Sequence, residues 1–178
     1  MSLYSKWAKK EQTETRRILA LLPAGMLFLY LLPLGIARGG LSIDRKFGLS
    51  SLDLGTFNSI LGGLLMGVGF FFAFWSIYDQ FSRARGTPLP MLPTQKLLID
   101  GPFRYCRNPM TLGTIVAYLG IGVYAGTIAG IGMVLLFGLS LILYLKLLEE
   151  KELTERFGEA YLAYKREVPF IIPRLPRR

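Results

Sequence analysis

An uncharged run of 35 residues, from Thr111 to Leu145, constrains the fold of this chain more than any other feature. A bilayer's hydrocarbon core is crossed by roughly 20 apolar residues in a helix. The run is therefore too long for one crossing and slightly short for two complete crossings with a turn. Its length leaves the number of crossings open, but a chain that is 52% hydrophobic belongs among membrane proteins.

Two earlier apolar segments have the length of single membrane crossings. Ile18–Ile36 follows five basic residues, and Leu54–Tyr78 ends in an aromatic cluster. No convincing small-residue cleavage site follows the first segment, so we expect a retained transmembrane helix rather than a signal peptide.

The distribution of basic residues decides the number of crossings. If the N-terminus, the 79–110 loop and the C-terminal tail are cytoplasmic, 18 Lys and Arg lie inside and three outside. The run from Thr111 must then return, turning near Tyr124–Thr127. The sequence predicts an all-α, polytopic integral membrane protein with four transmembrane helices, the last two a tight hairpin, followed by a cytoplasmic C-terminal helix. We expect one domain over 1–178, with two N-terminal helices in 1–78 and a core in 79–178.

Composition excludes several kinds of chemistry. The chain has no histidine and one cysteine, Cys106, so imidazole catalysis, a His/Cys zinc site and an intrachain disulfide are excluded, and we expect no metal. The net charge of +9 comes from residues that flank apolar spans rather than from one basic patch, which argues against nucleic acid. Cys106 itself is interpreted as a small buried filler rather than a nucleophile.

Glycines recur at four-residue spacing in two of the spans. Gly63 and Gly67 form one pair, and Gly122, Gly126 and Gly130 form a second series. Small residues at this spacing allow membrane helices to approach closely, so we predict tight packing at these positions.

Two polar segments border the hairpin. The first, residues 101–110, is called the arginine loop and reads Gly-Pro-Phe-Arg-Tyr-Cys-Arg-Asn-Pro-Met. The second is a predicted helix beyond Leu145 whose inward face carries Glu150, Leu153, Phe157, Tyr161, Tyr164 and Val168. Glu149 and Glu150 begin this face, whereas Glu152 with Arg156 fits the solvated side.

Carboxylates on a packed face need partners, because an unpaired charge in a poorly hydrated site costs several kcal/mol. Arg104 and Arg107 are the candidates. A purely structural arginine–glutamate clamp would explain these residues. A zwitterionic ligand would use the same set, with arginine for a carboxylate, glutamate for an ammonium or ribose, and an aromatic ring for a purine. The residues alone leave both interpretations open.

The arginine loop, followed by Glu-Glu-Lys-Glu-Leu and then Phe157-Gly158, Tyr161, Tyr164 and Val168-Pro169, resembles the isoprenylcysteine carboxyl methyltransferase and phospholipid methyltransferase group of membrane enzymes. The resemblance implies S-adenosylmethionine as methyl donor, a lipid or lipid-linked acceptor, and a prokaryotic cell membrane. It assigns donor binding to Arg104, Tyr105, Arg107, Asn108, Pro109, Met110, Glu150, Tyr161 and Tyr164. Asn108, Thr111 and Phe170 depart from the common pattern, and Asn108 cannot act as a base.

We hypothesise that Arg104, Glu149 and Glu150 are catalytic. An arginine of the loop holds the donor carboxylate, Glu150 its ammonium or ribose, and Glu149 an acceptor proton or charge. Two alternatives stay open: a non-catalytic membrane scaffold that binds anionic lipid or a partner protein, and a sterol-reductase-like oxidoreductase that uses a reduced nicotinamide.

Overall fold

The computed structural model describes residues 13–89 and 92–175, and these residues form helices and no strands. The α-helices are α2 (Glu14–Met26), α3 (Leu32–Leu34), α4 (Gly40–Phe47), α5 (Thr56–Ser82), α6 (Pro109–Tyr124), α7 (Ile128–Tyr144), α8 (Glu150–Phe157) and α9 (Glu159–Glu167). Three π-helical segments, η1 (Leu27–Leu31), η2 (Gly35–Gly39) and η4 (Leu145–Glu149), join some of them, and η3 (Gly101–Arg104) is a 3-10 helix.

Three helical runs among the described residues are long and apolar enough to cross a membrane. They are Glu14–Phe47, Thr56–Ser82 and Ile128–Phe157. The apolar helix α6 has 16 residues, or about 24 Å at 1.5 Å per residue, which is shorter than a hydrocarbon core. The predicted all-helical membrane protein is confirmed, whereas a fourth crossing stays a prediction.

The first helical run is longer than its predicted membrane span. It continues past Ile36 to Phe47 and ends at Gly48, which adopts the left-handed conformation (φ 63°) that caps a helix. The predicted span stopped at Ile36, before the charge of Arg38, because a charge ends a membrane span, but a charge does not end a helix. The π-helical segments η1 and η2 follow Pro23 and Pro33, whose missing N–H groups interrupt regular helical hydrogen bonding.

The chain divides into two compact units, each built from segments that are distant in sequence. The first unit contains the described residues up to Leu21, Phe72–Met110 and the described residues from Ile142 onward. The second contains Leu22–Phe71 and Thr111–Leu141.

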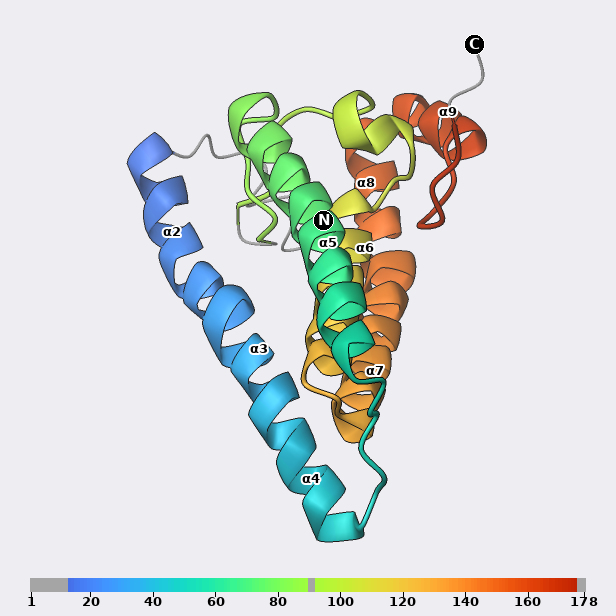
Figure 1. The fold of residues 1–178 in the computed structure, drawn as a ribbon. Coiled ribbons are helices and arrows are strands. Elements are labelled where there is room, and N and C mark those ends of the chain that lie inside the picture. Colours follow the sequence, from blue (N-terminus) through green and yellow to red (C-terminus); the bar gives the residue numbers. More distant parts are fainter. Residues whose placement is uncertain (1–12, 90–91, 176–178) are drawn as a thin grey trace. The chain divides into compact units, whose positions relative to one another are not determined.

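The core of the second unit surrounds Tyr118, which is 1% exposed. Its ring lies 6.0 Å from the ring of Phe137, and its hydroxyl donates to the backbone oxygen of Phe28 at 2.6 Å. Ile36, Ala117 and Val134 complete the buried cluster. Helices α6 and α7 lie side by side in this unit (Figure 1), and the turn between them falls at 125–127, where the sequence predicts it.

The glycine pair in α5 was assigned incorrectly from its spacing. Gly63 and Gly67 have no neighbouring atom within 4 Å of an added Cβ. The close approaches occur instead at Gly62, beside Gly120 and Tyr124, and at Gly69, beside Gly113 and Ala117. A helix has 3.6 residues per turn, so positions one or two residues away face a different neighbour. Gly122, Gly126 and Gly130 are tightly packed, as predicted.

The turn before α7 is stabilised by the buried carboxylate of Asp44. Thr127 Oγ1 donates to Asp44 Oδ2 at 2.6 Å, and the backbone N–H of Ala129 donates to Oδ1 at 2.8 Å. Asp44 therefore acts as a cap from a distant segment, because the first N–H groups of a helix lack intrahelical partners.

Replacing Asp44 with alanine is expected to lower the free energy of unfolding by about 1–2 kcal/mol, the usual cost of losing a helix cap. The exposed Asp53, whose side chain accepts from the Gly55 N–H at 2.9 Å, is the control, and its replacement should cost less than about 0.5 kcal/mol. Denaturant unfolding in detergent micelles measures both. Equal losses for D44A and D53A would contradict the capping role.

Candidate functional site

The arginine loop lies in the first unit and begins in a conformation that requires glycine. Gly101 has φ 60°, and a Cβ at this position would collide with the carboxylate of Asp79, which is 2% exposed. The η3 turn carries Phe103 and Arg104, and Pro109 begins α6, where a proline at the first helical position loses no hydrogen bond. These constraints fix both ends of the loop.

The C-terminal tail, residues 168–175, is hydrogen-bonded to the arginine loop. The N–H of Arg107 donates to the oxygen of Pro169 at 2.9 Å, and the N–H of Arg174 donates to the oxygen of Tyr105 at 3.0 Å. Asn108 Nδ2 donates to the oxygen of Phe170 at 2.9 Å. Asn108 is thereby engaged with the backbone of the tail, to which Phe170 contributes its carbonyl oxygen.

Glu150 lies at the centre of a buried ionic cluster. Arg107 Nη1 is 2.6 Å from Glu150 Oε1, and Lys165 Nζ donates to Oε2 at 2.7 Å. Arg107 Nη1 also donates to the hydroxyl of Tyr161 at 3.4 Å. These four residues are called the Glu150 cluster. The ion pair that we expected between the arginine loop and the acidic start of the helix is present for Arg107 and Glu150.

Two polar atoms of the Glu150 cluster lack a hydrogen-bond partner among the described residues. They are Arg107 Nε and Glu150 Oε1, on side chains that are each 9% exposed. Arg107 Nη1 is close to Oε1, but the contact is an ion pair without hydrogen-bond geometry. Arg107 Nε is therefore an unpaired donor in a buried setting, where unpaired polar groups are costly, and Oε1 is held only by its ion pair with Arg107.

Burial also raises the pKa values of the two tyrosines of this region, Tyr161 and Tyr164. Burial, and next the Glu150 carboxylate, raise the pKa of Tyr161 to about 12. Burial raises the pKa of Tyr164 above its usual range, and its hydroxyl donates to the oxygen of Phe103 at 2.6 Å. Both hydroxyls are therefore protonated at neutral pH and serve as hydrogen-bonding groups, not as bases.

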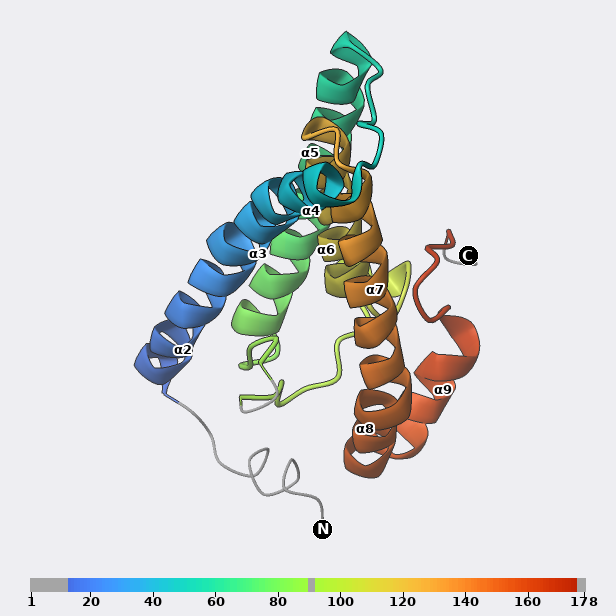
Figure 2. The same cartoon turned by 90° about the horizontal axis from the view of Figure 1, so that it is seen from below.

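Lys165 joins this site because the predicted helix is broken. At Gly158 (φ 54°, ψ −131°) the chain turns, and α9 folds back beside α8 (Figure 2). Sequence reasoning missed Lys165 because it extended one regular helix from Leu145 through Val168. Glycine at the end of a helical pattern is a signal for such a break.

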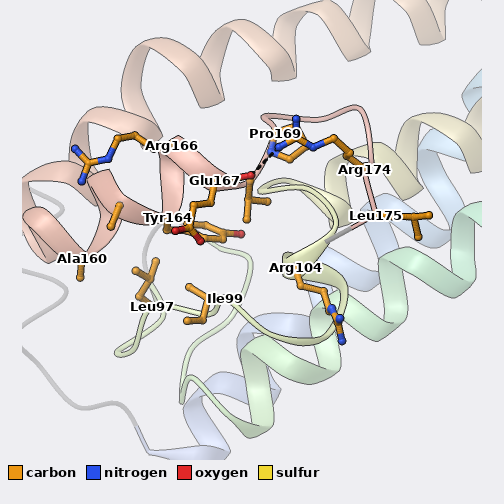
Figure 3. A pocket seen from close by; sticks show the side chains of 12 residues that line it. Leu97, Ile99, Arg104, Ala160, Tyr164, Arg166, Glu167, Pro169, Arg174 and Leu175 are labelled. Atoms are coloured by element: carbon orange, nitrogen blue, oxygen red, sulfur yellow. Dashed lines mark hydrogen bonds between the residues drawn. The ribbon is translucent and has the colours of Figure 1, made fainter. Parts of the chain in front are cut away.

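An open groove of about 820 Å³ lies beside Tyr164 and Arg104 (Figure 3). The remaining lining residues are Leu97, Ile99, Ala160, Ala163, Arg166, Glu167, Val168, Pro169, Arg174 and Leu175. The wall is largely apolar with three arginines, and Arg174 Nη2 donates to the backbone oxygen of Glu167 at 3.0 Å. Arg166 and Arg174 were not predicted as site residues.

The predicted site residues therefore separate into groups. Arg107, Glu150 and Tyr161 meet in the Glu150 cluster, whereas Arg104 is exposed, with its guanidinium 5.5 Å from the Tyr105 ring centroid, and lines the groove with Tyr164. Glu149 is half-buried and forms no ion pair with any residue in the described part of the chain. Pro109 and Met110 begin α6.

The solvated position predicted for Glu152 and Arg156 is wrong, although their ion pair is present at 3.0 Å. Their side chains are only 12% and 11% exposed, because Arg156 Nη2 also donates to the backbone oxygen of Thr94, which lies between α5 and η3. In the same connection the N–H of Thr87 donates to the oxygen of Leu92 at 2.9 Å.

Cys106 is 1% exposed, and burial raises the pKa of its thiol to about 11. The thiol is therefore protonated at neutral pH, which agrees with its interpretation as a filler. The described residues contain no group of three or more metal-ligating side chains.

The sequence profile of the phospholipid methyltransferase family matches residues 57–160, more than half of the chain, so this chain belongs to that family of membrane methyltransferases. The match includes the arginine loop and Glu150 and ends one residue before Tyr161. Searches of curated proteins and of solved structures found no match.

Proposed function

We propose that this protein transfers a methyl group from S-adenosylmethionine to a lipid-linked or small hydrophobic acceptor at the cytoplasmic face of a prokaryotic cell membrane. Family membership supports methyl transfer. The observation that carries the donor proposal is the Glu150 cluster, which offers a buried carboxylate and a buried guanidinium, each with an unsatisfied polar atom.

The residues present fit the donor's polar groups. A carboxylate is recognised by a guanidinium, and an ammonium by a carboxylate. We assign the donor carboxylate to Arg104 or Arg107, its ammonium or ribose to Glu150, and its adenosine to Tyr161 or Tyr164, with Tyr105, Asn108, Pro109 and Met110 shaping the loop. The groove beside Arg104 and Tyr164 supplies an aromatic ring and apolar walls for a nucleoside.

The donor's sulfonium supplies an electrophilic methyl group. What the chain contributes is alignment and exclusion of water, because holding two reactants in line removes much of the entropic barrier. Glu149, half-buried next to Glu150, is proposed to accept a proton when the acceptor is an amine. A carboxylate or thiolate acceptor needs no base.

We further propose that α6 and α7 form a hairpin that supplies the third and fourth crossings, with both termini and α9 in the cytoplasm. The distribution of basic residues supports this orientation. We propose that residues 1–178 act as one domain, because each compact unit combines segments that alternate along the sequence.

Ligand-induced stabilisation tests the donor proposal. S-adenosylmethionine and S-adenosylhomocysteine should raise the melting temperature of the purified protein in detergent, because a ligand that binds only the folded state stabilises it. NADPH should not, which separates this function from a reductase, and a scaffold would respond to none of the three. Glu150→Gln should weaken S-adenosylhomocysteine binding at least tenfold by calorimetry, and an unchanged affinity would remove Glu150 from the donor site.

A further inference from the structure

Glu150 is paired with two cations that differ in their freedom to move. The Arg107 side chain is only 9% exposed and also contacts Tyr161, so it is held in place on both sides. The Lys165 side chain is 41% exposed and reaches Glu150 Oε2 from the surface of α9. Of the two cations, Lys165 is the one that can leave.

The cluster carries more positive than negative charge. One carboxylate faces two cations, and an excess charge in a poorly hydrated site is unfavourable. A lysine ammonium is compact, strongly hydrated and attached to a flexible stem, so its return to water costs little. Arginine is the better permanent partner of a buried carboxylate, because its planar guanidinium is more weakly hydrated.

We propose that Lys165 is an exchangeable counter-ion of Glu150 that occupies the position of the donor's ammonium and is displaced when the donor binds. This inference rests on the proposed function and takes the ammonium, rather than the ribose, as the donor group that Glu150 binds. Without the donor, Lys165 keeps Glu150 paired. With the donor, one ammonium replaces another on Oε2, and Arg107 stays in place.

Such an exchange makes Lys165 a specificity-determining residue. A nucleoside without an ammonium cannot replace Lys165 and gains nothing from Glu150. A ligand with an ammonium must compete with Lys165, so its apparent affinity is reduced by the fraction of molecules in which Glu150 is occupied. Removing the lysine should therefore leave the affinity for a nucleoside without an ammonium unchanged. It should substantially increase the affinity for a ligand that carries an ammonium.

Calorimetry with two probes tests this inference. S-adenosylhomocysteine carries the ammonium and no sulfonium, and 5′-methylthioadenosine lacks the whole amino-acid portion. Lys165→Met should tighten S-adenosylhomocysteine binding about tenfold, the effect of a 1.4 kcal/mol competitor. It should leave 5′-methylthioadenosine unchanged. Lys151→Met, at an exposed lysine of α8, is the matched control and should change neither affinity.

Lys165→Gln serves as a second variant, and unfolding without ligand shows whether each variant is folded. An S-adenosylhomocysteine affinity that is unchanged or weaker in both Lys165 variants overturns the inference. So does equal tightening of both probes, or failure of both variants to fold, since Lys165 would then be a structural partner. Glu150→Gln separates the two hypotheses. If E150Q binds normally, the proposed function fails, and if E150Q binds weakly while the Lys165 variants do not bind more tightly, only this inference fails.

Discussion

Replacement of Arg107 with methionine is expected to destabilise the protein by about 3 kcal/mol and to abolish donor binding. Removing one partner of a buried ion pair typically costs about 3–5 kcal/mol, because the other charge stays buried. The lower end of this range applies here because Lys165 still faces Glu150 at 2.7 Å. Denaturant unfolding in detergent and calorimetry with S-adenosylhomocysteine measure the two effects.

The double variant R107M/E150M separates stability from binding. With both charges replaced by apolar groups of similar size, most of the lost stability should return, since buried ion pairs are often no more stabilising than well-packed apolar residues. Donor binding should stay absent. If R107M alone is as stable as the wild type, the ion pair seen at 2.6 Å does not persist in solution.

Substitution of Gly69 with alanine is expected to cost about 3 kcal/mol, the upper part of the range for overpacked cores. The new methyl group would lie 2.5 Å from the backbone oxygen of Gly113 and 2.7 Å from Ala117 Cα. Because both contacts are backbone atoms of α6, no rotamer change relieves them. Loss of the folded protein in detergent, or a lowered denaturation midpoint, is the expected result.

Gly67→Ala is the matched control for that substitution. Gly67 lies in the same helix, and an added Cβ meets nothing within 4 Å. Alanine there should be neutral or stabilise the protein by up to about 1 kcal/mol, the difference in helix propensity between alanine and glycine. Equal effects of G67A and G69A would show that the close approach of α5 and α6 at Gly69 is absent in solution.

These two glycines illustrate what the sequence could and could not predict. Hydropathy and length identified the apolar helices, because both are local properties of the chain, and the distribution of basic residues predicted the turn at 125–127. Spacing alone pointed to Gly67 instead of Gly69, since the face that meets α6 depends on how two helices are rotated against each other. Such rotation is a tertiary property that one sequence does not encode in its periodicity.

The site follows the same division. The pairing of Arg107 with Glu150 was predictable, because a carboxylate on a packed face needs a cation and the arginine loop supplies one. The contact of Lys165 with Glu150 was not predictable. A single positive-φ residue, Gly158, redirects α9, and this brings Lys165, 15 residues beyond Glu150 in the chain, onto the Glu150 carboxylate. We also predicted Arg104 as a partner of Glu149 or Glu150, but the structure places Arg104 at the groove.

The burial of Cys106 has a practical use. Since the sole thiol of the chain is buried and protonated, a membrane-impermeant maleimide should leave the native protein unmodified in intact cells. Single cysteines introduced at exposed positions such as Ser51 and Lys151 would then report sidedness against a silent background. Labelling only of the cysteine at position 51 would match the proposed orientation. Labelling only of the cysteine at position 151 would show the opposite orientation.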